Sequence, residues 1–202
     1  MKLVMRQSRD GETEIVDLAP ADEPGIIEHL YRSHGVLIGG ARRDELLEWK
    51  RRAYEQAIDR GLPPFPGALE FVQRAATRYA LAIASGSMHR EVELLLNRLE
   101  LRGAFAAVTG ADDCERTKPD PEAFFRTLAR LQQLPRFEQQ PLSAAECLVI
   151  EDAPHGILAA HRAGMRCLAL SHSLPPEKLQ QAVWVYRGFA EVDLETIVAA
   201  FA

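Results

Sequence analysis

The sequence predicts an α/β fold in which helices cover both faces of a parallel β-sheet. Two observations lead to this prediction. Short apolar runs alternate with amphipathic segments from residue 65 onward, and parallel strands are joined by helical crossovers of this kind. Polar side chains also follow several of these runs at their carboxyl ends, which is where such sheets bind ligands.

Four apolar runs are predicted to be the strands of this sheet, near residues 80–84, 105–108, 147–151 and 166–170. The segments that follow the first three, "REVELLLNRLEL", "PEAFFRTLARLQQL" and "GILAAHRAG", have apolar residues at helical spacing. Pro121 lies near the first turn of the second helix, and Gly164 is expected to end the third. The order of strand, helix and strand therefore favours a parallel arrangement.

The first 62 residues have a different pattern. The stretches "DEPGIIEHLYRSHG" and "RRDELLEWKRRAYEQAIDRG" predict two helices joined by a turn near Gly39 and Gly40, with no clear strand between them. The sequence "LPPFPG" at 62–67 then forms a stiff, proline-rich junction into the α/β part. We therefore expect a small helical unit before the main domain.

Composition narrows the class of protein. The chain has 202 residues, enough for one core and a small second unit, and its net charge of −5 argues against a nucleic-acid partner. Neither a membrane-spanning segment nor a signal segment is evident, so we expect a cytoplasmic protein with no membrane partner. Cys114, Cys147 and Cys167 lack the spacing of metal ligands and are expected to be reduced thiols.

Polar residues at three strand ends could form a phosphoryl-binding site. Ser85 offers a hydroxyl, Gly86 a close backbone N–H, and Ser87 opens the next helix, where an anion could rest. Lys118 could neutralise phosphoryl charge. The adjacent acids Glu151 and Asp152 could hold Mg²⁺.

Each of these signals also has a plain structural interpretation. Ser-Gly-Ser before a helix is commonly an N-cap, and "KPDPE" at 118–122 is typical of a turn in which Asp120 caps a helix. An acidic pair at a strand end is commonly solvated. The joint order of the three signals, at successive strand ends, favours the functional interpretation.

Three ordered stretches resemble motifs of the haloacid dehalogenase superfamily, in its β-phosphoglucomutase-like branch: "LAIASGSMHREVELLLNRLEL", "TGADDCERTKPDPEAFF" and "CLVIEDAPHGILAAHRAGMRCLAL". The resemblance implies a Rossmann-like core at 63–202 and a partial helical cap at 1–62. It implies that Ser85 and the Gly86 amide bind the phosphoryl group, and that Lys118 stabilises its charge. Glu151 and Asp152 would bind or orient Mg²⁺.

The family's nucleophile motif, Asp-x-Asp-Gly after a first strand, does not occur in this sequence. Its nearest counterpart is Ser8-Arg9-Asp10-Gly11, which has Ser8 in the nucleophile's place and leaves Asp10 as the tentative catalytic acid. The family's first strand is central, so its omission would leave two facing strand edges unpaired. Residues 1–7 are the candidate to fill that slot. The chain is expected to be either truncated or a remnant that has lost catalysis.

Two functional hypotheses follow. The first is a phosphatase or phosphomutase-like hydrolase, monomeric and Mg²⁺-dependent, that acts on a small phosphorylated metabolite and is impaired or inactive without the nucleophile motif. The alternative is a non-catalytic protein of the same fold that binds phosphate or a phosphorylated metabolite. Asp112 and Asp113 are expected to form a loop, and Trp49 and Trp184 to be packing anchors. The scattered histidines are expected to be surface or helix-packing residues: His29, His34, His89, His161 and His172.

Overall fold

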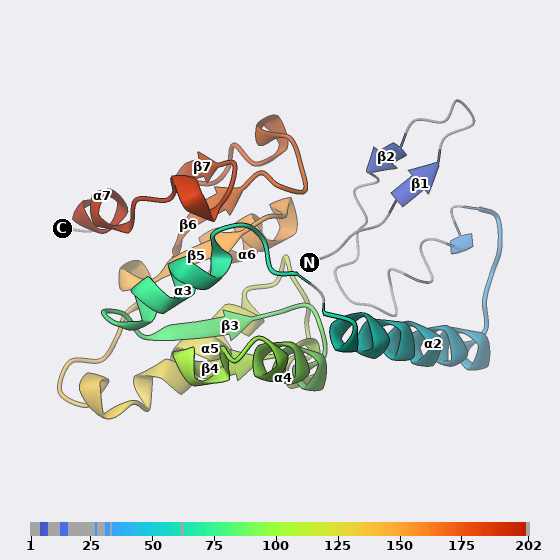
Figure 1. Ribbon diagram of the computed structural model, residues 1–202, viewed down its shortest axis with the longest axis horizontal. Helices are drawn as coiled ribbons and strands as arrows, with labels where there is room; N and C mark the ends of the chain where they lie inside the picture. The colour runs from blue at the N-terminus through green and yellow to red at the C-terminus, as the bar shows by residue number, and fades with distance from the viewer. Residues whose placement is uncertain are drawn as a thin grey trace.

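The computed structural model describes residues 5–7, 13–15, 27, 31–32, 34–61 and 63–200 (Figure 1). The helices are α2 (Gly40–Asp59), α3 (Ala68–Ala76), α4 (His89–Arg98), α5 (Glu122–Gln132), α6 (Pro154–Arg162) and α7 (Leu194–Ala199). The strands are β1 (Met5–Gln7), β2 (Thr13–Ile15), β3 (Leu81–Ala84), β4 (Phe105–Thr109), β5 (Leu148–Glu151), β6 (Arg166–Leu170) and β7 (Trp184–Tyr186).

The predicted α/β fold is confirmed, and all four predicted strands are present as β3, β4, β5 and β6. They do not form one continuous sheet. β3 pairs in parallel with β4, and β5, β6 and β7 form a second parallel sheet, so that β3 and β5 share no backbone ladder. The strand β7, which has three residues and forms the edge of the second sheet, was not predicted from the sequence.

The short N-terminal strand does not join either parallel sheet. Met5–Gln7 pairs antiparallel with Thr13–Ile15 and forms a separate two-stranded sheet. The expectation that residues 1–7 fill a central slot is therefore not met by Met5–Gln7, whose backbone hydrogen bonds go to β2. Residues 1–4 lie outside the described part of the chain, as do Ser8 and Asp10.

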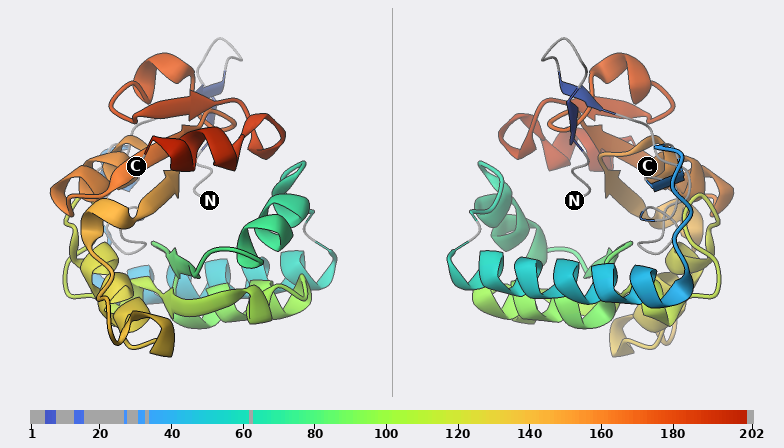
Figure 2. Two further views of the ribbon diagram at one scale, coloured as in Figure 1. Left: turned by 90° about the vertical axis from the view of Figure 1, so that its left-hand side faces the viewer. Right: turned by 90° about the vertical axis from the view of Figure 1, so that its right-hand side faces the viewer.

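Side chains alternate between the two faces of the strands, as expected for strands covered by helices on both sides. On β6, Cys167 and Ala169 pack with α5 and α6, whereas Leu168 and Leu170 pack with α3 and α7. α4 packs against Val108 of β4 in a third hydrophobic cluster. Figure 2 shows the β3–β4 pair with α2 and α4 on one side of the molecule and β6, β7 and α7 on the other.

The two sheets are held together by side chains rather than by a backbone ladder. Val72 of α3 packs against the cluster that contains β6 and against the cluster that contains β4. Leu81 of β3 packs against the same cluster as Leu148 and Ile150 of β5. Yet every residue of β3 remains partly exposed, whereas β6 has four fully buried residues. A fully paired β3 would be among the most buried strands, so its exposure marks an open edge.

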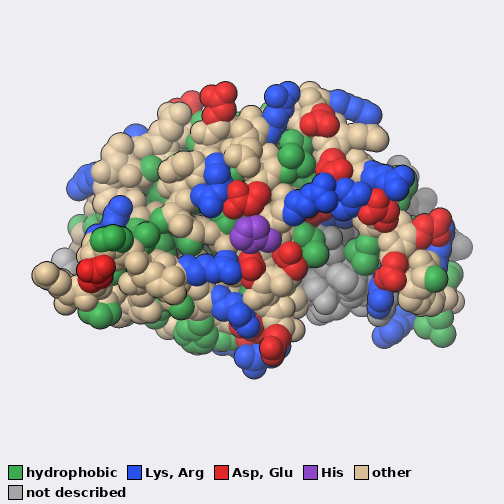
Figure 3. Space-filling view, turned by 90° about the horizontal axis from the view of Figure 1, so that it is seen from below, with side chains coloured by type: hydrophobic (Ala, Val, Ile, Leu, Met, Phe, Trp, Pro, Cys, Tyr) green, Lys and Arg blue, Asp and Glu red, His purple; other side chains and the backbone are tan. Residues whose placement is uncertain are grey.

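Helix α2 packs alongside α4 through ion pairs. Lys50 Nζ lies 3.1 Å from Glu91 Oε1, and Arg90 lies 3.2 Å from Glu55. Glu91 is buried, so Lys50 supplies the counter-charge that its carboxylate needs. Figure 3 shows acidic and basic side chains interspersed on this face of the molecule. The expectation that Trp49 packs is wrong, because its position on α2 leaves it 69% exposed; Trp184 does pack against the core.

All three cysteines are free thiols, in agreement with the prediction of reduced cysteines. Cys167 is fully buried in the core, while Cys114 and Cys147 are partly buried. Burial raises the pKa of Cys167 to about 12 and that of Cys147 to about 11. Both are therefore protonated and unreactive near neutral pH.

Candidate active site

Lys118 connects the two parallel sheets at their carboxyl ends. Its Nζ donates to the backbone oxygen of Ala84 at 3.0 Å and forms an ion pair with Glu151 Oε1. Ala84 ends β3 and Glu151 ends β5. The side chains of Lys118 and Glu151 are only 14% and 11% exposed. The structure thus places Lys118 beside Glu151 and against the residue that precedes Ser85.

The loop that carries Lys118 is fixed from both ends. The Asp120 side chain accepts a hydrogen bond from Glu122 N, the first residue of α5, at 3.0 Å, although the N-cap of the helix is Pro121 and not Asp120 as predicted. Glu122 in turn accepts from the backbone N–H groups of Glu115 and Arg116, at 3.0 and 2.8 Å. These N–H groups lower the pKa of Glu122 to about 2. The loop is therefore set by charge-assisted bonds to its own backbone.

The Ser85 loop lies between β3 and α4. The Ser85 hydroxyl accepts a hydrogen bond from Ser87 N at 3.0 Å, and Ser85 N donates to Thr109 O at 2.9 Å. The prediction that Ser87 opens the helix is wrong by two residues, because α4 begins at His89. Glu91, which bonds Met88 N, and an extended Met88 backbone set this later start. The loop therefore presents Ser85 and Gly86 ahead of the helix.

A second loop, at residues 109–113, is bonded to the Ser85 loop. Ala111 N donates to Ser87 O at 2.9 Å, and His89 N donates to Asp112 Oδ1 at 2.6 Å. Gly110 passes so close to His89 that a Cβ at this glycine would lie 2.2 Å from His89 N. Asp112 thus shapes the loop, as expected from the sequence.

Asp113 anchors the same loop to α5. Arg130 NH2 donates to Asp113 Oδ1 at 2.9 Å, Gly110 N donates to Oδ2 at 2.8 Å, and His89 Nδ1 lies 2.8 Å from the same oxygen. The Arg130 guanidinium is the main cause that holds the pKa of Asp113 well below its usual range, and the contacts from His89 and Gly110 act in the same direction against the effect of burial. Asp113 is therefore an ionised structural anchor near neutral pH.

Glu151 is packed tightly beneath the start of α6. A Cβ at Gly156 would lie 2.1 Å from Glu151 Cδ, so only glycine leaves room for the carboxylate in its present position. The chain thus uses Gly156 to accommodate the acid that Lys118 contacts. The sequence pattern alone did not identify Gly156 as part of the site.

Asp152 points to a different set of partners. His172 Nε2 lies 3.2 Å from Asp152 Oδ2, and the Ser173 hydroxyl donates to the same oxygen at 3.3 Å. The His172 ring also lies against Phe65, with ring centroids 4.0 Å apart. The sequence analysis expected His172 to be a surface or packing residue and missed this contact. The signal was present, because "SHS" follows β6 as Ser85 follows β3.

Glu151 and Asp152 have the donor chemistry that Mg²⁺ requires, since both offer carboxylate oxygens. Two carboxylates do not complete an octahedral shell. Within the described ranges, no three His, Cys, Asp or Glu side chains come together as a metal-binding group. Asp10 lies outside those ranges. The two acids could therefore supply at most part of an Mg²⁺ shell, and water would have to supply the remaining ligands.

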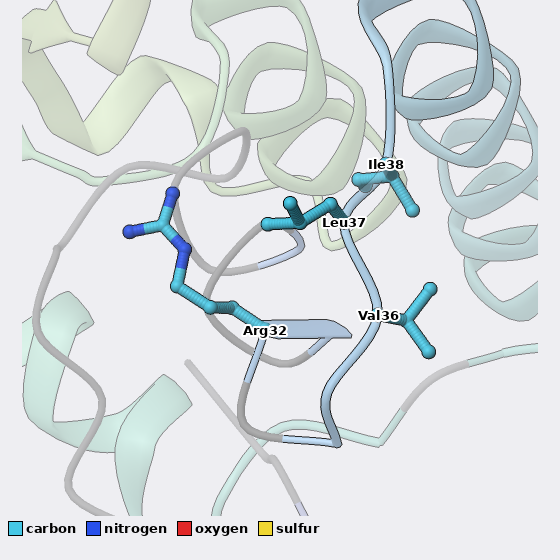
Figure 4. Close-up of a pocket in the computed structure, with 4 residues that line it drawn as sticks. All are labelled: Arg32, Val36, Leu37 and Ile38. Atoms are coloured by element: carbon cyan, nitrogen blue, oxygen red, sulfur yellow. The ribbon is translucent and has the colours of Figure 1, made fainter.

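A surface pocket lies elsewhere, in the segment before α2. It is lined by Arg32, Val36, Leu37 and Ile38 (Figure 4). None of these residues belongs to the site around Lys118, and Leu37 is 83% exposed.

No helix in the described part of the chain combines the length and the apolar composition of a membrane-spanning segment.

Comparison with known proteins places this site in a family. The haloacid dehalogenase-like hydrolase family profile matches residues 27–170. A haloacid dehalogenase-like hydrolase domain-containing protein of Arabidopsis thaliana is 30% identical over 165 residues, which are 77% of this chain and 49% of that protein. A phosphorylated carbohydrates phosphatase of Thermotoga maritima is 33% identical over 139 residues, 65% of this chain and 59% of that protein.

The fold has close counterparts among solved structures. β-Phosphoglucomutase from Clostridium difficile aligns with a TM-score of 0.75 and 20% identity, over 89% of this chain and 77% of that one. This likeness concerns the fold. This chain spans only about half to three fifths of the two curated relatives. The matched motifs, the fold and the family profile together show that the chain belongs to the haloacid dehalogenase-like hydrolases.

Proposed function

We propose that this chain carries the phosphate- and metal-binding half of a phosphatase or phosphomutase site that takes a small phosphorylated metabolite. The observation that carries the proposal is the Lys118–Glu151 ion pair beside Ala84. It gathers the ends of β3 and β5 and the intervening loop around one buried cation. Curated relatives include a phosphorylated carbohydrates phosphatase and a fructose-1-phosphate phosphatase, which supports a phosphorylated substrate.

Each residue has a distinct role in this proposal. The Ser85 hydroxyl and the Gly86 N–H bind phosphoryl oxygens, and Lys118 neutralises their charge. Glu151 and Asp152 hold Mg²⁺, which would screen phosphoryl charge when bound. Lys118 gives two of its three N–H donors to Ala84 and Glu151, so the third is left for a phosphoryl oxygen. The two contacts thus hold the ammonium group at the site before substrate binds.

The proposal also divides the chain into two parts. Residues 1–62 are a partial helical cap, of which α2 is the described helix, and residues 63–202 are the catalytic core. The proline-rich junction between them would let the cap close over the strand ends and select the substrate. The expectation of a cytoplasmic monomer rests on the sequence alone and is retained as part of this proposal.

A second candidate is a phosphate-binding protein without turnover. The specific observation in its favour is that the sequence contains no Asp-x-Asp-Gly, the motif that supplies the family's carboxylate nucleophile. Asp10 is the tentative acid that would decide between the two candidates. Both candidates use the same binding residues.

Phosphate binding tests the shared part of the proposal. Inorganic phosphate should bind the purified chain in the presence of Mg²⁺, as followed by ³¹P NMR line broadening. Ser85→Ala and Lys118→Ala should each weaken binding about tenfold or more, because each removes a hydrogen bond to a charged group. Lys178→Ala changes an exposed lysine outside the site and should leave binding unchanged. Equal effects of the two lysine variants would rule out a specific site.

A further inference from the structure

His172 connects three parts of the molecule. It follows β6, contacts Asp152 after β5, and stacks on Phe65 in the junction between α2 and α3. Its side chain is only 16% exposed. A histidine that merely covered the surface would not be enclosed by a carboxylate on one side and an aromatic ring on the other.

The contacts to Asp152 all fall on one of its two oxygens. His172 Nε2 and Ser173 Oγ both meet Oδ2, at 3.2 and 3.3 Å. In the part of the chain that the structure describes, Oδ1 accepts no hydrogen bond from another side chain. The Ser173 hydrogen bond and the His172 contact therefore restrict the carboxylate rotation and leave Oδ1 available to a cation.

The contact to Phe65 links this carboxylate to the helical segment. Phe65 lies between Pro64 and Pro66, whose rings restrict the backbone and limit how far the phenyl ring can shift independently. The 37° angle and 4.0 Å separation of the two rings make direct packing contact. A displacement of the junction that carries α2 would therefore disturb His172 first and Asp152 through it.

We propose that His172 is a positioning residue that holds Asp152 in its cation-binding rotamer and couples that rotamer to the proline-rich junction through Phe65. The inference rests on the proposed metal-binding role of Asp152. Removing an outer-shell partner of a metal ligand commonly changes metal affinity by about 10- to 100-fold. The site would thus sense the position of the helical segment through one imidazole ring.

Two substitutions at this position separate ring packing from the polar contact. His172→Phe keeps an aromatic ring against Phe65 but removes the ring nitrogen that contacts Asp152. His172→Gln keeps an N–H donor at about the same reach but removes the ring. His161→Gln changes an exposed histidine on α6 and serves as the matched control. The Mg²⁺ dissociation constant of each variant is read from the amide shift of Asp152 in ¹H–¹⁵N NMR titrations with MgCl₂.

We expect His172→Phe to weaken Mg²⁺ binding about tenfold, His172→Gln to stay closer to wild type than to His172→Phe, and the control to be unchanged. Phe65→Leu should weaken Mg²⁺ binding in the same direction. Wild-type Mg²⁺ affinity in His172→Phe would overturn the positioning role. Unchanged affinity in Phe65→Leu would overturn the coupling to the junction.

A metal-free double-mutant cycle keeps the inference separate from the proposed function. His172→Phe and Asp152→Asn are combined, and unfolding by urea is measured without Mg²⁺. A coupling of at least about twofold in the unfolding equilibrium constant supports the positioning contact, and additive effects overturn it. If wild-type protein shows no Mg²⁺-dependent shift at all, the metal role of Asp152 fails, while the cycle still decides whether His172 holds that carboxylate.

Discussion

Lys118 and Glu151 form a nearly buried ion pair between two sheets that share no backbone ladder. Each residue stands at the carboxyl edge of a different half of the fold, after β4 and at the end of β5. The pair therefore serves two purposes at once. It supports the junction of the two sheets, and it orients the Lys118 ammonium group, to which we assign phosphoryl binding.

Removing only one member of this pair should destabilise the protein. Lys118→Met leaves the Glu151 carboxylate buried without its counter-charge, and we expect the free energy of unfolding to fall by about 3 kcal/mol. The double variant Lys118→Met, Glu151→Leu removes both charges and should recover most of that loss. Urea denaturation measures both values. A double variant no more stable than the single one would show that the pair does not act as described.

Adding a methyl group at Gly156 should disable the site while preserving the fold. The new Cβ would overlap the Glu151 carboxylate, whose flexible side chain can move away, and the helix itself tolerates alanine well. We expect Gly156→Ala to lose phosphate and Mg²⁺ binding while its circular dichroism spectrum stays unchanged. Gly103→Ala is the matched control, because its Cβ meets nothing within 4 Å. Intact binding in Gly156→Ala would mean that Glu151 need not occupy its present position.

The low pKa of Asp113 predicts a specific pH dependence of stability. Its folded-state pKa lies below the unfolded value, so its contribution is fully present above about pH 4 and is lost as pH falls toward the folded pKa. Asp113→Asn should lower the free energy of unfolding by about 1–2 kcal/mol at pH 7. The difference between variant and wild type should narrow below pH 4 in thermal melts. If the stability difference between Asp113→Asn and the wild type stays constant down to pH 2, the low pKa of Asp113 is contradicted.

Magnesium binding by this chain should be weak. Glu151 and Asp152 supply two carboxylates, and water must fill the rest of the octahedral shell. Titration calorimetry with MgCl₂ should therefore show little heat at micromolar metal, and Asp152→Asn should abolish what binding there is. Tight binding would mean that a further carboxylate completes the site, and Asp10 is the first residue to substitute in that case.

The parallel pairing of the strands and the proximity of Lys118 to Glu151 could be predicted from the sequence because both depend on local patterns, whereas the division into two sheets could not. Apolar runs such as 147–151 set the strands, and polar residues at their ends must gather at one edge when the strands are parallel. For that reason Lys118 and Glu151 were expected near each other and are found in contact.

The remaining features depend on spacing that the sequence does not display. Gly156 reads as an ordinary helix residue until Glu151 is placed beneath it. His172 and Phe65 are over 100 residues apart, and only the folded chain brings their rings together. The start of α4 at His89 likewise follows from Glu91 bonding Met88 N, a competition that a Ser-Gly-Ser pattern does not reveal.

Hydrolysis of p-nitrophenyl phosphate in the presence of Mg²⁺ tests most directly the claim that this chain has the binding half of the site without its nucleophile. Positioning and charge stabilisation by Lys118 cannot replace an attacking group, so we predict turnover at or near background for the chain of 202 residues. Fusing a strand that ends in Asp-x-Asp-Gly to its N-terminus should bring Mg²⁺-dependent activity that Lys118→Ala and Asp152→Asn each suppress. Robust Mg²⁺-dependent hydrolysis by the unmodified chain would contradict the account, and Ser8→Ala and Asp10→Asn would then identify the residue responsible.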